Sequence, residues 1–406
     1  MTTVHDADGL VVLALLWLPL VALAIRANAE EAFTVDASFP GGNVIVDRID
    51  GDFVALHQDV RDTAGHWFWW HFRVRGAAGR TLTFYFTRGN VLGVRGPAVS
   101  TDGGKAWSWL GAKAVEGNSF RYTFPKDAQE TRFCFAMPYF EANLKAFLRR
   151  YAGSSHLRTR ALCTTKKGRT TERLHAGKLD GEPDCRVLVT ARHHACECMA
   201  SYSIEGIIET VLGDTDAGKW LREHVEFLIV PFMDKDGVED GDQGKNRKPR
   251  DHNRDYDGES VYPSVRAVRK LVPEWSEGRL KVHFDLHCPH IRGAHNEVIY
   301  MVGNHDEAVW EQQQAFGKVI ETVQKGPLVY RASDNLPFGQ AWNTAKNYGG
   351  GKSSSRWGSE LEGIRLATSF EIPYANARGR EVTAESARAF GRDLAAALQR
   401  YLTQPE

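Results

Sequence analysis

The chain has 406 residues, of which 42% are hydrophobic and 25% are charged. This length suggests two domains, each able to bury a sizeable core. The 51 basic residues balance the 51 acidic residues, so the chain lacks the basic excess that nucleic-acid binding requires. We therefore expect a soluble globular protein with no nucleic-acid partner.

Residues 10–25 form an uncharged, apolar run that is followed shortly by Ala27-Asn28-Ala29. The run is short for a membrane span and matches the apolar centre and cleavage site of a secretory signal peptide. Asp6 and Asp8 argue against a signal, and a wrongly chosen start codon would explain them. We expect residues 1–29 to be a signal peptide, which implies export to the periplasm or medium and no stable membrane span after processing. An uncleaved anchor or a buried helix is the alternative, and without a genuine signal the protein is cytoplasmic.

The six cysteines are too few for this length to form a dense disulfide framework. Cys163 and Cys185 lie outside the dense motifs, so they are the pair to test for a disulfide bond. We expect the other four cysteines to be free, buried thiols.

Residues 32–153 have the pattern of short strands and turns, which predicts an N-terminal antiparallel β-sandwich domain. Residues 66–76 (HWFWWHFRVRG) and 80–89 (RTLTFYFTRG) mix aromatic and β-branched residues with alternating polar ones. Strand periodicity favours a core position for the aromatic side chains, with a ligand-binding platform as the alternative. Residues 141–151 predict a short helix that leads out of the domain.

After a polar, basic segment at 164–173, apolar strands alternate with amphipathic helices, and we expect residues 154–406 to form a second domain. The helices are predicted at 201–213 and 384–402. The strands are predicted from four apolar runs: 185–191, 224–233, 280–287 and 366–374. Strands separated by helices predict an α/β fold with a mixed sheet flanked by helices. In such sheets, functional groups gather at the carboxyl ends of the strands.

The segment 190–202 (TARHHACECMASY) follows the first of these strands and contains five residues of types that bind zinc: His193, His194, Cys196, Glu197 and Cys198. His194 and Glu197 are three residues apart, so on one helical turn they would share a face and could bind one ion. A lone HxxE pattern is weak support for this, because a surface salt bridge gives the same spacing.

Three later features strengthen the metal-site hypothesis. His287 closes the strand at 280–287, and Asn253-Arg254 follow the strand at 224–233. Glu371 lies inside an apolar strand, where a carboxylate is costly unless it has a partner or a role.

Together these motifs resemble the zinc metallocarboxypeptidase family, in the family's own order. His194 and Glu197 fit its HxxE motif, and His287 fits its third ligand. The matching features downstream are the segment 231–237 (P-x-x-x-x-D-G), Asn253-Arg254, the tyrosine loop from Tyr348 to Trp357, and Glu371. The resemblance covers about residues 174–402. The preceding β-sandwich and the DLHCPH segment are similar to the cytosolic carboxypeptidase branch, which is associated with removal of glutamate residues.

The resemblance implies one Zn²⁺ per chain, bound by His194, Glu197 and His287 with a fourth position open, as in catalytic sites. His290 is the competitor for the third ligand position. Glu371 would be the general base. Asp285 and His193 would support the ligands from behind, with a surface position as the alternative for His193. Cys196 and Cys198 would face away from the metal and pack in the interior.

The resemblance also implies a set of substrate-binding residues. Asn253 and Arg254 would hold the terminal carboxylate of the substrate, and Tyr348 would close over it. An arginine would stabilise the oxyanion, with Arg247 preferred and Arg250 as the alternative. Arg356 would favour an acidic substrate side chain, although a surface salt bridge accounts for it equally well.

These features predict a zinc metallocarboxypeptidase that removes the C-terminal residue of a peptide or protein, with acidic residues as one option. One alternative is an amidohydrolase that acts on peptidoglycan stem peptides or on N-acyl amino acids. Another is an inactive homologue that binds zinc or peptide, against which the presence of Glu371 argues.

Overall fold

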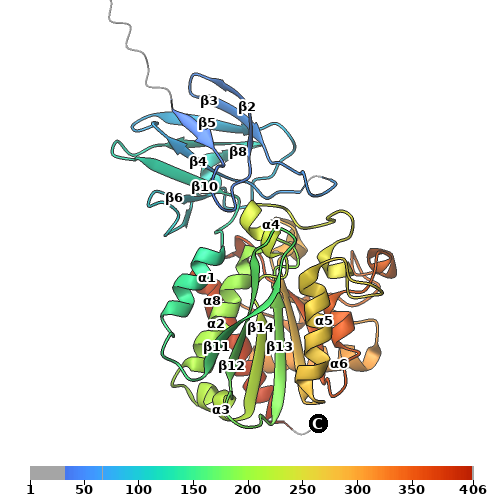
Figure 1. The fold of residues 1–406 in the computed structure, drawn as a ribbon. Coiled ribbons are helices and arrows are strands. Elements are labelled where there is room, and N and C mark those ends of the chain that lie inside the picture. The colour runs from blue at the N-terminus through green and yellow to red at the C-terminus, as the bar shows by residue number, and fades with distance from the viewer. Residues whose placement is uncertain (1–32, 66, 405–406) are drawn as a thin grey trace, which may run out of the picture. The chain divides into compact units, whose positions relative to one another are not determined.

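The computed structural model describes residues 33–65 and 67–404 (Figure 1). The predicted signal peptide lies outside this part of the chain. Among the described residues, no helix is both long enough and apolar enough to cross a membrane.

The N-terminal region contains two five-stranded sheets. The first has the order β1-β4-β10-β6-β7, and its strands are β1 (Thr34–Asp36), β4 (His71–Arg75), β10 (Glu130–Cys134), β6 (Ala98–Ser100) and β7 (Ser108–Trp109). The second has the order β2-β3-β5-β9-β8, and its strands are β2 (Ile45–Asp50), β3 (Phe53–His57), β5 (Thr81–Phe86), β9 (Ser119–Thr123) and β8 (Val115–Glu116).

Aromatic side chains fill the space between these two sheets. The ring of Phe72 in β4 lies 5.2 Å from that of Phe84 in β5, and the rings of Phe133 and Phe120 are 5.4 Å apart. The β-rich N-terminal region and its aromatic core therefore agree with the sequence. One feature differs from the expected antiparallel sandwich, because β3 and β5 pair in parallel.

The second part of the chain is built on a seven-stranded mixed sheet of order β11-β12-β14-β13-β15-β17-β16. Its strands are β11 (Leu157–Thr164), β12 (Thr170–Gly177), β14 (Val225–Val230), β13 (Cys185–Ala191), β15 (Leu280–His287), β17 (Leu366–Glu371) and β16 (Tyr300–Val302). The central strands β14, β13, β15 and β17 are mutually parallel, and the outer strands run antiparallel to their neighbours. A small hairpin of β18 (Asn376–Ala377) and β19 (Arg380–Glu381) follows β17.

Helices cover both faces of this sheet, which confirms the α/β fold (Figure 1). Val187 and Val189 of β13 pack in one core with α2 (Cys198–Leu212), α6 (Glu307–Val323) and α8 (Ala384–Leu402). Leu188, between them, points to the opposite face and packs against α5 (Pro263–Ser276). The remaining helices are α1 (Glu141–Arg149), α3 (Asp216–His224), α4 (Lys235–Asp240) and α7 (Ser354–Gly358).

Helices α2 and α8 pack with their backbones in close contact, which positions the start of α2. A Cβ atom added to Gly206 would lie 1.9 Å from the carbonyl oxygen of Arg388, and one added to Gly391 would lie 2.0 Å from that of Ser203. Only glycine permits this approach at either position. The first turn of α2, which directly follows Glu197, is thereby held against a rigid neighbour.

The expected disulfide candidate does not form in this fold, since Cys163 and Cys185 are both free. Cys163 lies in β11 and Cys185 begins β13, and the sheet order places β12 and β14 between them. Neighbouring strands lie about 4.8 Å apart, so this separation far exceeds the reach of a disulfide bond.

Candidate metal centre

The carboxyl ends of three parallel strands bring the predicted ligands together. His194 follows β13, His287 is the last residue of β15, and Glu371 is the last residue of the adjacent β17. His287 and Glu371 are direct partners in the register of those two strands. Parallel strands end at the same edge of a sheet, so residues distant in sequence meet there.

The turn that carries His194 is braced from inside by Arg192. Arg192 adopts a left-handed backbone conformation with φ of 61° and is fully buried. Its guanidinium donates hydrogen bonds to the carbonyl oxygens of Ala195 and Tyr139, at 3.1 and 3.0 Å. A non-glycine residue at positive φ is strained, so these bonds hold the turn in a conformation that it would not otherwise keep. The sequence analysis did not identify this residue.

His194, Glu197 and His287 form a compact group whose ligand atoms all lie within 4.8 Å of one another. Nδ1 of His194 lies 2.8 Å from Glu197 Oε1, and Nδ1 of His287 lies 2.6 Å from Glu197 Oε2. Both imidazoles thus point the same nitrogen toward the same carboxylate. Two imidazoles and one carboxylate, with a position left open, are a donor set typical of catalytic zinc.

A carboxylate lies behind each of the two histidines. Nε2 of His194 is 3.1 Å from Asp251 Oδ1, and Nε2 of His287 is 2.8 Å from Asp285 Oδ2. A carboxylate that accepts a hydrogen bond from the far nitrogen keeps the proton there and leaves Nδ1 free to bind a metal. The arrangement around Glu197 therefore fits a zinc ion.

A second group of possible ligands, His193, Asp285 and His287, shares one histidine with the first. It would use Nε2 of His287 instead of Nδ1. His193 and Asp285 are fully buried, and Nε2 of His193 lies 2.8 Å from the hydroxyl of Tyr256. Neither lines the cavity that His194 and His287 line, so this group supports the first and offers no open position for a substrate there.

Six of the predicted site residues line one cavity of about 310 Å³. Its lining includes His194, His287, Asn253, Arg254, Tyr348 and Glu371, and also His290, the competitor for the third ligand position. The structure places His287 in the ligand group and leaves His290 against the ring of Phe68, 5.2 Å away.

The charges at the centre oppose one another. Burial alone would raise the pKa of Glu197, but His194, Lys245 and His287 hold the pKa of this carboxyl well below its usual range. Burial raises the pKa of Glu371 to about 7, with Lys245 acting against the rise and the Glu197 charge adding to it. Oε2 of Glu371 has no hydrogen-bond partner among the described residues.

Arg254 and Tyr348 form one wall of the cavity. The Arg254 guanidinium carbon lies 4.8 Å from the centre of the Tyr348 ring. Its Nη1 and Nε donate to the carbonyl oxygens of Asn253 and Asn347, at 2.7 and 3.0 Å. The Tyr348 hydroxyl donates to Asn343 Oδ1 at 3.0 Å.

Besides Glu197, which contacts both histidine ligands from outside the lining, three predicted arginines do not line this cavity. Arg247 is held by three carboxylates: its Nη1 is 2.9 Å from Asp242, and its Nη2 is 2.5 Å from Asp234 and 3.6 Å from Asp62. Arg250 pairs with Asp255 at 3.0 Å. Arg356 packs behind Tyr348, with its Nη2 3.3 Å from Nε2 of His305.

The cation that the structure does place beside the metal ligands is Lys245, which the sequence analysis overlooked. Its Nζ lies 2.6 Å from Glu197 Oε1.

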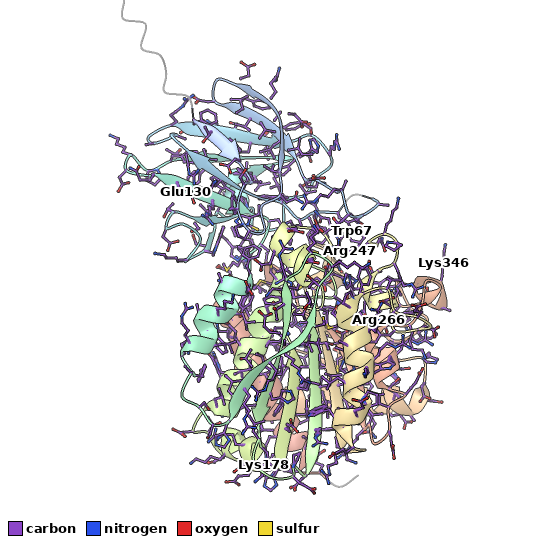
Figure 2. All side chains as sticks on the ribbon, viewed as in Figure 1. Trp67, Glu130, Lys178, Arg247, Arg266 and Lys346 are labelled. Carbon is purple, nitrogen blue, oxygen red and sulfur yellow. The ribbon has the colours of Figure 1, made fainter. Side chains whose placement is uncertain are left out.

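Trp67 from the β-rich region also lines the cavity, with its ring 5.8 Å from the Lys245 Nζ. The aromatic run at 66–76 is therefore not entirely core, because its first tryptophan faces the site. Figure 2 shows Trp67 and Arg247 where the β-rich region meets the α/β domain, with Lys178 at the far end.

The two cysteines of the motif stay in the interior. Cys196 and Cys198 are both buried, and neither belongs to a group of possible metal ligands among the described residues. The sulfur of Cys196 lies 3.7 Å from the hydroxyl of Tyr374.

Comparisons with known proteins agree with this geometry. Residues 144–265 match the zinc carboxypeptidase family model. Human cytosolic carboxypeptidase 2 is 24% identical over 339 residues, covering 73% of this chain and 37% of that protein. Cytosolic carboxypeptidase 6 of Caenorhabditis elegans is 23% identical over 318 residues, covering 69% of this chain and 67% of that protein. The chain spans about a third of the length of the first of these relatives.

Solved structures extend the likeness to the β-rich region. The metallo-carboxypeptidase of Burkholderia cenocepacia superposes with a TM-score of 0.73 at 22% identity, covering 91% of this chain and 98% of that one. The metallo-carboxypeptidase of Pseudomonas aeruginosa gives a TM-score of 0.70 at 22% identity, with 91% and 99% covered. Residues 144–265 thus match the zinc carboxypeptidase family model, and the solved metallo-carboxypeptidases share the fold of this chain, an α/β domain that follows a β-rich N-terminal region.

Proposed function

We propose that this protein is a zinc-dependent metallocarboxypeptidase that hydrolyses the last peptide bond of a peptide or protein. The observation that carries the proposal is a single cavity lined by two metal ligands, a buried carboxylate and a guanidinium: His194, His287, Glu371 and Arg254. An exopeptidase needs a group for the metal, one for proton transfer and one for the chain terminus. All of these face the same space.

When bound at this centre, zinc supplies Lewis acidity, which lowers the pKa of water and polarises a carbonyl group. Glu371 acts as the general base, because its unpartnered Oε2 is able to accept a proton from the attacking water. The same oxygen then delivers that proton to the nitrogen of the leaving amine. Its position at the end of β17, directly opposite His287, fixes this oxygen relative to the ligands.

Arg254 selects the end of the substrate chain. A planar guanidinium binds a carboxylate through two parallel hydrogen bonds, and the two backbone carbonyls that it already contacts fix its orientation. Tyr348 packs against the guanidinium and is able to cover the bound terminus. Asn253 connects the tyrosine loop to the ligand His287. Its Oδ1 accepts from the backbone N–H of Ser354, and its Nδ2 lies 3.0 Å from His287.

The preferred substrate side chain follows from the rest of the lining. Tyr300, Val302, Trp342 and Ser369 line the cavity and carry no charge. Arg356, on which the expectation of an acidic preference rested, is instead engaged with His305. We therefore expect peptides ending in a neutral residue to be cleaved faster than those ending in glutamate.

The exchange of Glu371 for glutamine tests the mechanism. We expect Glu371→Gln to lower kcat by about 10²- to 10⁴-fold, the usual contribution of a general base, while the zinc content stays that of the parent. Zinc is measured by atomic emission, and cleavage is followed as release of the C-terminal residue. The exposed Glu362 provides the control, since Glu362→Gln should leave both quantities unchanged. A zinc-loaded Glu371→Gln protein that cleaves at the parent rate would refute this assignment.

A further inference from the structure

Lys245 is a nearly buried cation at the metal centre that the proposed mechanism does not use. Its side chain is 13% exposed, and its Nζ lies 2.6 Å from Glu197 Oε1. The same Nζ donates a hydrogen bond to the carbonyl oxygen of Cys288 at 3.1 Å. Cys288 directly follows the ligand His287, so the ammonium lies between the segments that carry two of the three ligands.

Few positive charges reach the cavity. Among the described residues that line it, Lys245 and Arg254 are the only lysine or arginine side chains. Arg254 is oriented by the backbone beside Tyr348 and is assigned to the substrate carboxylate. Hydrolysis also develops a negative charge on the carbonyl oxygen, and a positive group near that oxygen lowers the barrier. Lys245 is the remaining cation in reach.

The loop that carries Lys245 is bound to the β-rich region by several hydrogen bonds. The Asp62 carboxylate accepts from the backbone N–H groups of Gln243 and Gly244, at 3.1 and 2.8 Å. The Gln243 side chain bonds to both backbone groups of Trp69, accepting at 2.6 Å and donating at 2.8 Å. The Thr63 hydroxyl donates to the carbonyl oxygen of Lys245 itself.

The same loop lies directly on the metal-binding turn. Gly244 has φ of +80°, and a Cβ atom there would lie 2.2 Å from the backbone nitrogen of Ala195. The N–H of Cys196 donates to the carbonyl oxygen of Gln243 at 3.1 Å. Only glycine allows this contact, so the backbone places residue 245 beside the ligands whatever its side chain does.

We propose that Lys245 supplies the positive charge that faces the oxyanion of the reaction, and that Asp62 of the β-rich region positions it. The inference rests on the proposed function. Water forms a bond to the carbonyl carbon, and the carbonyl electron pair moves to oxygen beside the Lys245 ammonium. The pair then returns as the carbon–nitrogen bond breaks, and the amine leaves with the proton carried by Glu371. Lys245 keeps its own proton throughout.

The substitution Lys245→Met tests this role, and Lys245→Arg tests whether charge is what matters. For Lys245→Met we expect kcat to fall about 10²- to 10³-fold with KM changed little, as for loss of an oxyanion donor. A second readout is the affinity for a phosphonate peptide, whose tetrahedral anion resembles the charge of the reacting centre. We expect that affinity to fall by a similar factor, while zinc content is kept. Lys245→Arg should recover part of both.

Lys248, an exposed lysine on the same loop, is the matched control, and Lys248→Met should match the parent in both readouts. Three results would overturn the role of Lys245. One is parent-like turnover and phosphonate affinity in Lys245→Met. Another is a Lys245→Met protein that loses zinc but whose zinc-loaded fraction binds the phosphonate with parent affinity. In that case Lys245 would only hold Glu197 in place. The third is a Lys245→Arg variant no better than Lys245→Met. A parent protein that cleaves no peptide would instead contradict the proposed function.

The positioning role of Asp62 is tested by a double-mutant cycle. Asp62→Asn should lower kcat and phosphonate affinity without loss of zinc, and it should add little to the effect of Lys245→Met. Residues that act as one unit, here through the backbone of the loop that carries Lys245, give such non-additive effects. If the losses from the two substitutions simply multiply, Asp62 acts independently of Lys245.

Discussion

At the scale of single residues, the two aspartates behind the histidine ligands determine how the centre binds its metal. Asp251 contacts His194, and Asp285 contacts His287, each at the nitrogen remote from Glu197. Asp285 also accepts a hydrogen bond from the Thr190 hydroxyl at 2.8 Å, which fixes its orientation. Burial alone would raise the pKa of Asp285, but His193 and His287 hold the pKa well below its usual range. A carboxylate is therefore available to hold the His287 proton away from the metal side.

We expect Asp285→Asn to weaken zinc binding by about 10- to 100-fold, the usual effect of removing such a partner. The measurement is competition with a chromophoric zinc chelator. Asp393 offers a control, since its carboxylate accepts backbone N–H groups of Lys325 and Gly326 and is remote from the ligands in sequence and in contacts. Asp393→Asn should leave zinc affinity at the parent value. Equal affinities in the parent and Asp285→Asn would show that Asp285 has no part in holding the ligand.

Residue identity at the site was only partly predictable from sequence. His194, His287 and Glu371 could be found because each lies at or just beyond the end of an apolar strand, where a polar side chain is costly without a role. Glu197 could be found because it lies three residues after His194. Lys245 could not be identified in the same way, because it is one of four cations within six residues: Lys245, Arg247, Lys248 and Arg250. Only the three carboxylates around Arg247 decide which of them is withdrawn from the cavity. One of these carboxylates, Asp62, is distant in sequence from Asp234 and Asp242.

At the scale of elements, buried strands were predictable and exposed ones were not. The structure confirms residues 185–191 and 280–287 as β13 and β15, because both are rich in apolar residues and buried along almost their whole length. β11 and β12 escaped notice because β11 is an edge strand with exposed, charged residues such as Arg158 and Arg160. Charged edges protect a sheet from pairing with other chains and remove the hydrophobic signal.

The aromatic run at 66–76 shows another limit of sequence patterns. Its alternation predicts one long strand, but β4 begins only at His71. Trp69 leaves the sheet because its backbone bonds to Gln243 of the other domain, which replaces the strand partner. A contact between residues 174 positions apart has no local signature. Trp67 reaches the cavity for the same reason.

The start of β4 also carries an acid-sensitive histidine. His71 is buried among aromatic rings, and neither of its ring nitrogens has a hydrogen-bond partner among the described residues. Its ring stacks on Phe140 and meets Phe39 edge-on. Burial, with help from the Arg132 charge, lowers the pKa of His71 to about 3.

Because the folded pKa lies below the unfolded value of about 6.5, the unfolded chain takes up the proton first as pH falls. The stability that neutral His71 provides is full above pH 6.5 and is lost progressively toward pH 3. Between pH 7 and pH 4.5 we expect the parent to lose about 2 kcal/mol more unfolding free energy than His71→Leu. Urea unfolding at both pH values measures the difference. Identical losses in the two proteins would mean that His71 is protonated in the folded state.

At the scale of the whole molecule, the two parts of the chain share one site. The α/β domain supplies the three candidate ligands, the proposed general base and the guanidinium, while the β-rich region supplies Trp67 and the anchor for Lys245. Further contacts join the two parts, including a hydrogen bond from Trp109 Nε1 to the carbonyl oxygen of Val382 at 2.8 Å. The change in sequence pattern near residue 154 predicts the division into a β-rich part and an α/β part. Their joint contribution to the cavity was not.

If the protein is a metallocarboxypeptidase, it releases the last residue of a chain with a free carboxyl end, using a bound metal. The most direct measurement is mass spectrometry of two peptides that differ only in a free or an amidated C-terminus, each with zinc-loaded and with chelator-treated protein. We expect loss of a single C-terminal residue from the free acid, little change in the amide, and no cleavage after chelation. Internal fragments alone, equal cleavage of the amide, or turnover that survives chelation would contradict the proposed function.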